Sequence, residues 1–412
     1  MTEIEVLGSG REVGRSAILV SGKKRIMMDF GVKIEPEPPK YPPLEKVDAA
    51  IISHAHLDHV GAAPLLFKKG KQPIYMNDVT LELGTMLIKD SMKVARMEGF
   101  GTPFDKTDVK RMVKNTKIVR YNERFNVGEF SCTLWDSGHI PGSSSVLLDG
   151  KKKIFYTADI QSRPSNLLGA CKLPDKVDVL ITESTYGTKN QSPRKSEERR
   201  LLEAVEETVE NNGVALMPVF AVGRAQEVML ILKEYANKIA LDGMAKIASE
   251  IIGEYGSYIK NPNGFRALLK RVKFIRTNEE RAAAIKKYPI IIASAGMLGG
   301  GPAVRYLKEM QSLKDSKVLF SGFLVEDSPG RNLIETRVFE NGEERFSVHA
   351  DLQQVELSAH ADRAGLLDII RRTRPETVIC VHGDKCDEFA KDIEKEFNVQ
   401  AFAPKNGEKI KV

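Results

Sequence analysis

Three histidines and an aspartate fall within six consecutive residues of this chain, in the segment His-Ala-His-Leu-Asp-His at 54–59. A β-rich run at 49–53 comes directly before it. In an extended chain His54 and His56 point to the same side, where both imidazoles can bind one cation. Asp58 and His59 follow in the next turn and can face a second cation nearby. The sequence therefore predicts a divalent-metal site at the end of a strand.

Further candidate ligands stand singly at the ends of later predicted strands: His139, Asp159 and His382. Asp159 is the candidate bridge, because a carboxylate can bind two cations and a neutral imidazole ordinarily binds one. Asp29 closes another predicted strand, and we expect it beneath the site, orienting a ligand histidine or the turn. Six of the seven histidines lie in such strand-end loops. This clustering predicts a dinuclear zinc-type site rather than separate structural histidines.

The pattern of hydrophobic residues divides the chain into three parts. Residues 1–185 predict short strands with one helical stretch at 80–96. From 193 onward strands and helices alternate, as in a parallel α/β layer, and the last 55 residues alternate again. A length of 412 residues, at about 150 per domain, allows two or three domains. The net charge of +6 is expected to be diffuse, so folding must create any nucleic-acid surface.

Other sequence features concern the compartment. No run approaches the roughly 18 apolar residues that a membrane helix needs, and Glu3 and Glu5 do not suit a signal peptide. The four cysteines include no Cys-x-x-Cys motif, which argues against a disulfide framework and a cysteine zinc site. We therefore expect a cytoplasmic protein that does not interact with membranes.

In chain order, Asp29, the 54–59 segment, His139 and Asp159 resemble the four leading motifs of the metallo-β-lactamase superfamily. Later segments resemble its β-CASP branch of nucleic-acid-processing nucleases, with Glu183, His360 and His382 similar to motifs A, B and C. The N-terminal stretch at 10–20 is similar to archaeal homologues of the nuclease subunit of the cleavage and polyadenylation specificity factor. No KH-type domain precedes it, so we expect a short form.

The resemblance implies a metallo-β-lactamase αββα sandwich built from residues 1–185 and 358–412, with a β-CASP cap domain inserted at 186–357. It implies two Zn²⁺ ions per chain, with Asp159 as the bridging ligand. One ion would be held by His54, His56 and His139, and the other by Asp58, His59 and His382. The implied reaction is hydrolysis of single-stranded RNA by a metal-activated hydroxide, in 3′-end processing or RNA turnover.

The same resemblance assigns His360 as the proton donor to the departing oxygen, oriented by Glu183. Residues of the cap are candidates for substrate binding, each with a plainer alternative. Arg224 is either a phosphate clamp or a surface charge, and Ser294 and Ser358 are phosphate contacts or turn caps. Gly300 lies in a glycine-rich entry to a predicted helix, where free amide groups can meet an anion.

Several alternatives stay open at this point. A 5′-to-3′ exoribonuclease of the RNase J kind is the nearest, followed by a small-molecule metallohydrolase and a non-catalytic RNA-binding subunit. The cap of about 170 residues and the His360–His382 pair favour RNA over a small substrate. Every expected ligand position is filled, which favours catalysis. A homodimer, or association with other RNA-processing factors, is a further expectation.

Overall fold

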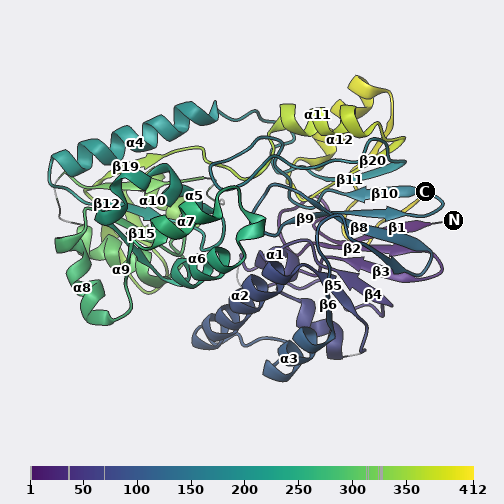
Figure 1. Cartoon of the computed structure of the whole chain (residues 1–412), viewed down its shortest axis with the longest axis horizontal. Coiled ribbons are helices and arrows are strands. Elements are labelled where there is room, and N and C mark those ends of the chain that lie inside the picture. The colour runs from purple at the N-terminus through teal and green to yellow at the C-terminus, as the bar shows by residue number, and fades with distance from the viewer. Residues whose placement is uncertain are drawn as a thin grey trace. The chain divides into compact units, whose positions relative to one another are not determined.

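The computed structural model describes residues 2–35, 38–68, 70–311, 313, 315–322, 324 and 328–412. The chain forms two compact units. Unit 1 comprises Met1–Pro164, Gly169–Asn190 and His360–Val412, and unit 2 comprises Ser165–Leu168 and Gln191–Ala359. In Figure 1 the purple, blue and yellow segments therefore belong to unit 1 and the green segments to unit 2.

Unit 1 contains two seven-stranded sheets, the first in the order β22-β1-β2-β3-β4-β5-β6. Its strands are β1 (Glu3–Gly8), β2 (Ala17–Ser21), β3 (Arg25–Met28), β4 (Ala49–Ile51), β5 (Ile74–Met76), β6 (Thr116–Ile118) and β22 (Lys409–Lys411). Strands β3, β4, β5 and β6 are parallel to one another, so their carboxyl ends share one edge. The accompanying helices are α1 (Leu57–Val60), η1 (Ala63–Lys68), α2 (Asp78–Met97) and α3 (Lys106–Asn115).

The second sheet of unit 1 has the order β21-β20-β11-β10-β9-β8-β7. Its strands are β7 (Arg124–Val127), β8 (Phe130–Asp136), β9 (Ser144–Asp149), β10 (Lys153–Tyr156), β11 (Val179–Glu183), β20 (Thr377–Val381) and β21 (Gln400–Phe402). Helices α11 (Arg363–Thr373) and α12 (Cys386–Phe397) flank it. Strand β20 pairs in parallel with β11, and β21 pairs in parallel with β20. The segment that follows unit 2 in the chain therefore adds the last two strands at one end of this sheet.

The two sheets pack face to face, with helices on both outer faces (Figure 1). Alternating residues of both sheets, such as Ile4 and Val6 of β1 and Val146 and Leu148 of β9, share one buried core. A second core lies between the first sheet and α2 and α3, and a third lies between the second sheet and α11 and α12. The predicted αββα sandwich is confirmed.

Unit 2 is built on a six-stranded parallel sheet in the order β14-β13-β15-β12-β16-β19. Its strands are β12 (Ala215–Pro218), β13 (Ile239–Asp242), β14 (Lys273–Phe274), β15 (Ile290–Ala293), β16 (Lys317–Phe320) and β19 (Asp351–Gln354), with the hairpin β17 (Val338–Glu340) and β18 (Arg345–Ser347). The helices are α4 (Arg194–Glu210), α5 (Arg224–Ile231), η2 (Lys233–Lys238), α6 (Met244–Glu254), η3 (Gly256–Tyr258), α7 (Pro262–Leu269), α8 (Asn278–Lys287), α9 (Gly301–Met310) and α10 (Pro329–Thr336). The predicted parallel α/β layer is confirmed.

Two helices differ from the periodicity of the sequence. The predicted helix at 80–96 is α2, which begins at Asp78 because the Asn77 side chain caps it, accepting a hydrogen bond from the Thr80 amide. Helix α3 was not predicted, although Asp105 and Asp108 form a capping box at its start. Within the described ranges, no helix has both the length and the hydrophobicity needed to cross a bilayer.

Candidate metal centre

The seven candidate ligands converge at one edge of unit 1, where strands of both sheets end. Their potential ligand atoms form two groups, and within each group all atoms lie within 4.8 Å of one another. The first group is His54, His56, His139 and Asp159, and the second is Asp58, His59, Asp159 and His382. Asp159 is common to both groups. The structure therefore brings together every ligand candidate of the sequence, in two sets joined by one carboxylate.

Asp159 lies at the centre of this arrangement. Its Oδ1 is 3.2 Å from Nε2 of His59, and its Oδ2 is 3.5 Å from Nε2 of both His54 and His139. Burial opposes ionisation of Asp159, but His382 and His59 hold the pKa of its carboxyl well below the usual range. An ionised carboxylate with one oxygen toward each histidine set is suited to bridging two cations.

A hydrogen-bond chain beneath the site fixes the orientation of two ligand histidines. Asp29 follows β3 and is fully buried. Its Oδ2 accepts a hydrogen bond from Nδ1 of His59 at 2.7 Å and another from Oγ of Ser53 at 2.8 Å. Because that hydroxyl proton goes to Asp29, Ser53 Oγ accepts from Nδ1 of His54 at 3.0 Å. Both imidazoles therefore present Nε2 to the site, so Asp29 orients a ligand in each set.

The donors fit a divalent cation of the zinc type. Nε2 of His54 is buried and makes no hydrogen bond. An unpaired buried polar atom costs about 1–3 kcal/mol, a cost that coordination removes. Nδ1 of His56 and Nε2 of His139 also face one another at 3.2 Å, as two ligands of one ion would. Five imidazoles and two carboxylates make a donor set that suits zinc.

Two of the ligand side chains, His54 and Asp58, already have the ionisation state that a cation needs. Burial lowers the pKa of His54 well below its usual range, and His59 lowers it further, so His54 keeps a free lone pair. Burial opposes ionisation of Asp58 too, but His59 and His382 lower the pKa of its carboxyl. Metal ligands must be deprotonated, and these two groups already are at neutral pH.

His360 and Glu183 form a pair beside the ligands. Nδ1 of His360 donates to both carboxylate oxygens of Glu183, at 2.9 and 3.0 Å. The centroids of the His360 and His139 rings are 4.6 Å apart. The amide of Ile160 also donates to Glu183, at 2.8 Å, which fixes the carboxylate. Burial opposes protonation of His360, but the charges of Glu183 and Asp159 raise its pKa to about 9. The pair can therefore hold a proton at Nε2 of His360.

Sequence reasoning did not identify three residues that support these groups. Ser53 links Asp29 to His54, and the hydroxyl of Tyr156 donates to Asp29 Oδ2 at 2.8 Å. The Gln161 side chain donates to the carbonyl of His360 at 2.8 Å. Tyr156 carried the clearest signal, because a buried phenol in a strand needs a hydrogen-bond partner.

The four substrate-binding candidates all lie in unit 2. Arg224 begins α5 after strand β12, and its guanidinium packs against Gly322. Ser294 follows β15, and its Oγ accepts a hydrogen bond at 3.0 Å from the amide of Met244, the first residue of α6. Gly300 is the cap residue of α9, and Ser358 is buried near the end of the unit. Loops at the carboxyl ends of parallel strands commonly bind ligands.

Models of three families match successive parts of the chain. The metallo-β-lactamase superfamily matches residues 10–205, the β-CASP domain 225–333, and the Zn-dependent metallo-hydrolase RNA specificity domain 345–404.

Several curated proteins are similar over 70–100% of their length. "Probable RNase MJ4" of Methanocaldococcus jannaschii is 37% identical, with 100% of both chains covered. RNase aCSPSF2 of Saccharolobus solfataricus is 33% identical, covering 99% of this chain and 85% of that one. Transcription termination factor FttA of Thermococcus kodakarensis is 34% identical, covering 98% and 70%. A crystal structure of a protein of unknown function from Enterococcus faecalis, at 16% identity and a TM-score of 0.60 over 99% of both chains, shares the fold.

Proposed function

Since the chain belongs to the β-CASP branch of the metallo-β-lactamase superfamily, and is accordingly a metal-dependent hydrolase, we propose that it cleaves phosphodiester bonds of single-stranded RNA. The observation that carries this proposal is the pair of ligand sets joined by Asp159, with a histidine proton donor beside them. The match to an RNA specificity domain and the ribonuclease names of similar proteins support RNA as the substrate.

The proposed cofactor is two Zn²⁺ ions per chain. One would be held by His54, His56 and His139, the other by Asp58, His59 and His382, and both by Asp159. When bound, such ions lower the pKa of water and neutralise charge on a phosphate. Asp29 would keep His54 and His59 in position through its hydrogen bonds to Ser53 and His59.

His360 would supply the proton that the departing oxygen needs. Glu183 occupies Nδ1, so the transferable proton is on Nε2. The charges of Glu183 and Asp159 overcome the effect of burial and raise the pKa of His360 to about 9, so the ring is protonated at neutral pH. Cations on the neighbouring ligands would lower this pKa towards neutrality, where a proton donor works best.

The substrate would approach where the site opens to solvent. His56, Asp58 and His360 are half-buried, whereas His54, His59 and Asp159 are buried. A phosphate arriving on the open side would meet Asp58 and His360 first. We propose that Asp58 also accepts a hydrogen bond from the attacking water, because its carboxyl has a lowered pKa and stays ionised.

Unit 2 is the proposed substrate-selecting part, with the domain boundaries predicted at 1–185, 186–357 and 358–412. Arg224 and Gly300 are at the carboxyl ends of its parallel strands or in the loops that follow, a position suited to phosphate. The Ser294 hydroxyl already accepts a hydrogen bond from the Met244 amide. Its O–H group would be the donor in the proposed phosphate contact. Because all four cysteines are free and buried, we propose that the reaction takes place in the cytoplasm.

Cleavage of labelled RNA tests the proposal. The zinc-loaded protein should hydrolyse single-stranded RNA and should leave a thioester untouched, and Asp159→Ala should be inactive. Turnover of the thioester without RNA cleavage would overturn the proposal in favour of a small-molecule hydrolase. The same assay with circular, 5′-triphosphate and 5′-monophosphate RNA distinguishes endonucleolytic from exonucleolytic cleavage. Cleavage of the circle indicates an endonuclease, and dependence on a 5′-monophosphate indicates an exonuclease.

A further inference from the structure

Helices α2 and α3 and strand β6 present a concentrated basic surface, which we call the α2–α3 face. Residues 86–120 contain nine basic and four acidic side chains, and all nine basic ones are exposed. This stretch carries a net charge of +5, against +6 for the whole chain. The expectation of a diffuse basic excess is therefore wrong, because a sum over 185 residues averages this segment with acidic neighbours.

Within the described part of the chain, most of the cations of this face make no ion pair. Among the described residues, only Arg111 of the nine forms an ion pair, at 3.4 Å from Asp108. On α2, Lys89, Lys93 and Arg96 lie three and four residues apart, so they form a row along one side of the helix. Unpaired cations in a row produce a local positive potential that favours an extended polyanion.

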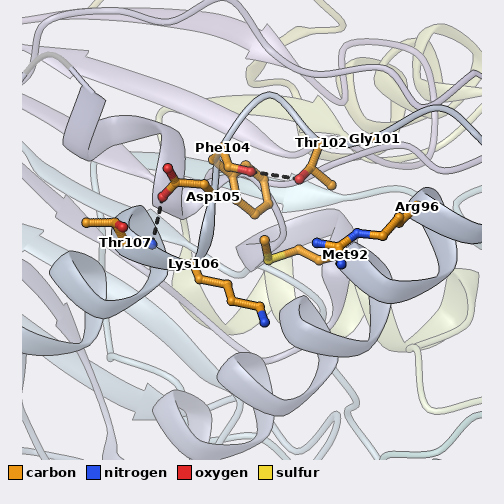
Figure 2. Close-up of a pocket in the computed structure, with 8 residues that line it drawn as sticks. All are labelled: Met92, Arg96, Gly101, Thr102, Phe104, Asp105, Lys106 and Thr107. Carbon is orange, nitrogen blue, oxygen red and sulfur yellow. Dashed lines mark hydrogen bonds between the residues drawn. The ribbon is translucent and has the colours of Figure 1, made fainter.

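A hollow lies between the end of α2 and the start of α3. It measures about 500 Å³, and Arg96 and Lys106 are among the residues that line it. Figure 2 shows these two side chains approaching it from different helices, with Met92 between them. Met97 and Phe100, which adjoin the lining residues Arg96 and Gly101 in sequence, are 76% and 45% exposed. An exposed aromatic ring among cations, such as that of Phe100, is a side chain on which a base of single-stranded nucleic acid can stack.

The face is connected to the metal centre through α2. The carbonyl of Gly142, in the loop that carries His139, accepts hydrogen bonds from Asn77 and, at 3.0 Å, from Thr80 at the start of the helix. At roughly 1.5 Å per residue, Lys89 lies about 17 Å and Arg96 about 27 Å along the helix from its first residue. At the ~3.4 Å rise of a stacked strand, about five to eight nucleotides span these distances.

We propose that the α2–α3 face is an RNA-binding site outside the catalytic centre, which holds the substrate several nucleotides from the bond that is cut. The inference rests on the proposed function, because it takes the substrate to be RNA. Charge complementarity selects the occupant: a linear row of unpaired cations suits a chain of phosphates better than it suits a compact acidic protein.

The test replaces Lys89, Lys93 and Arg96 together by Gln. The matched control replaces Lys391, Lys395 and Lys405, which are also exposed, make no ion pair within the described structure and belong to the same unit. Affinity is measured by fluorescence anisotropy with a hydrolysis-resistant RNA of about 20 nucleotides, and kcat/KM with cleavable RNAs of about 20 and about four nucleotides. Far-ultraviolet circular dichroism confirms folding of both variants.

We expect the α2 variant to bind the long RNA about 100-fold more weakly at ~0.1 M salt. The slope of log affinity against log salt should fall by about 2, since each lost phosphate contact removes about 0.7. Cleavage of the short RNA and all properties of the control variant should stay unchanged. Equal losses on both RNAs, equal losses in the control, or unchanged binding of the long RNA would each overturn the inference. Binding without cleavage by the unaltered protein would refute the proposed function alone.

Discussion

The hydrogen-bond chain beneath the metal centre makes a quantitative prediction for Asp29→Ala. Asp29 is fully buried and accepts hydrogen bonds from four donors. They are the Ser53 amide at 2.7 Å, the Ser53 hydroxyl at 2.8 Å, His59 Nδ1 at 2.7 Å and the Tyr156 hydroxyl at 2.8 Å. Each donor left unpaired in the interior costs about 1–3 kcal/mol. Removal of the carboxylate should therefore lower the free energy of unfolding of unit 1 by about 4–6 kcal/mol. The loss stays near the lower end of the range for four donors because water can enter the space that the carboxylate leaves and accept some of the hydrogen bonds.

Tyr156→Phe is the matched control for this prediction. It removes one donor, while Asp29 Oδ2 still accepts from Ser53 and His59, so the loss should be about 1 kcal/mol. The assay is urea unfolding of metal-free protein followed by tryptophan fluorescence. The single tryptophan, Trp135, lies in β8 and reports on unit 1 alone. If Asp29→Ala cost no more than Tyr156→Phe, the reasoning that Asp29 supports the site would be refuted. Zinc affinity should fall about 10–100-fold in Asp29→Ala, and much less in the control.

Three further changes test other parts of the account. Asp159→Ala should leave the far-ultraviolet circular dichroism unchanged and reduce bound zinc by at least one ion, measured by mass spectrometry; full zinc content would refute the bridging role. His360→Ala should slow RNA cleavage by about 10²–10⁴-fold with zinc content unchanged, and loss of zinc would make His360 a ligand. In unit 2, burial opposes ionisation of Asp242, but the Arg281 guanidinium at 2.5 and 3.0 Å lowers the pKa of its carboxyl. Its stabilisation is therefore complete above the unfolded pKa of about 3.9 and is lost as pH falls through the lower folded pKa. Asp242→Asn should cost about 3 kcal/mol near pH 7. In urea unfolding followed by circular dichroism, the two proteins should begin to converge as the pH falls below about 4 and should coincide only below the folded pKa of Asp242; a pH-independent difference would contradict this.

The ligand residues could be chosen from the sequence because their chemistry is local. The 54–59 segment combines three imidazoles and a carboxylate, and single His or Asp residues mark the ends of β10 and β20 and the β8–β9 loop. Parallel strands bring their carboxyl ends to one edge, so residues distant in sequence were expected to meet. The grouping around Asp159 follows from that topology.

Other features depend on contacts that no local pattern encodes. The partnership of Tyr156 with Asp29 requires the register of one sheet against the other, and these residues are 127 positions apart. The α2–α3 face was missed because charge was summed over whole blocks, and α3 because its capping box precedes a weakly hydrophobic helix. Arg224 and Gly300 stay predictions, since the sequence of each loop does not encode which ligand it binds.

The central claim is that two cations occupy the site with Asp159 between them. Anomalous diffraction at the zinc absorption edge, from crystals of the zinc-loaded protein, tests it most directly. The account predicts two peaks, one about 2 Å from ring nitrogens of His54, His56 and His139, and one at that distance from Asp58, His59 and His382. Each should also lie about 2 Å from an oxygen of Asp159. A single peak, or zinc bound away from Asp159, would contradict the account.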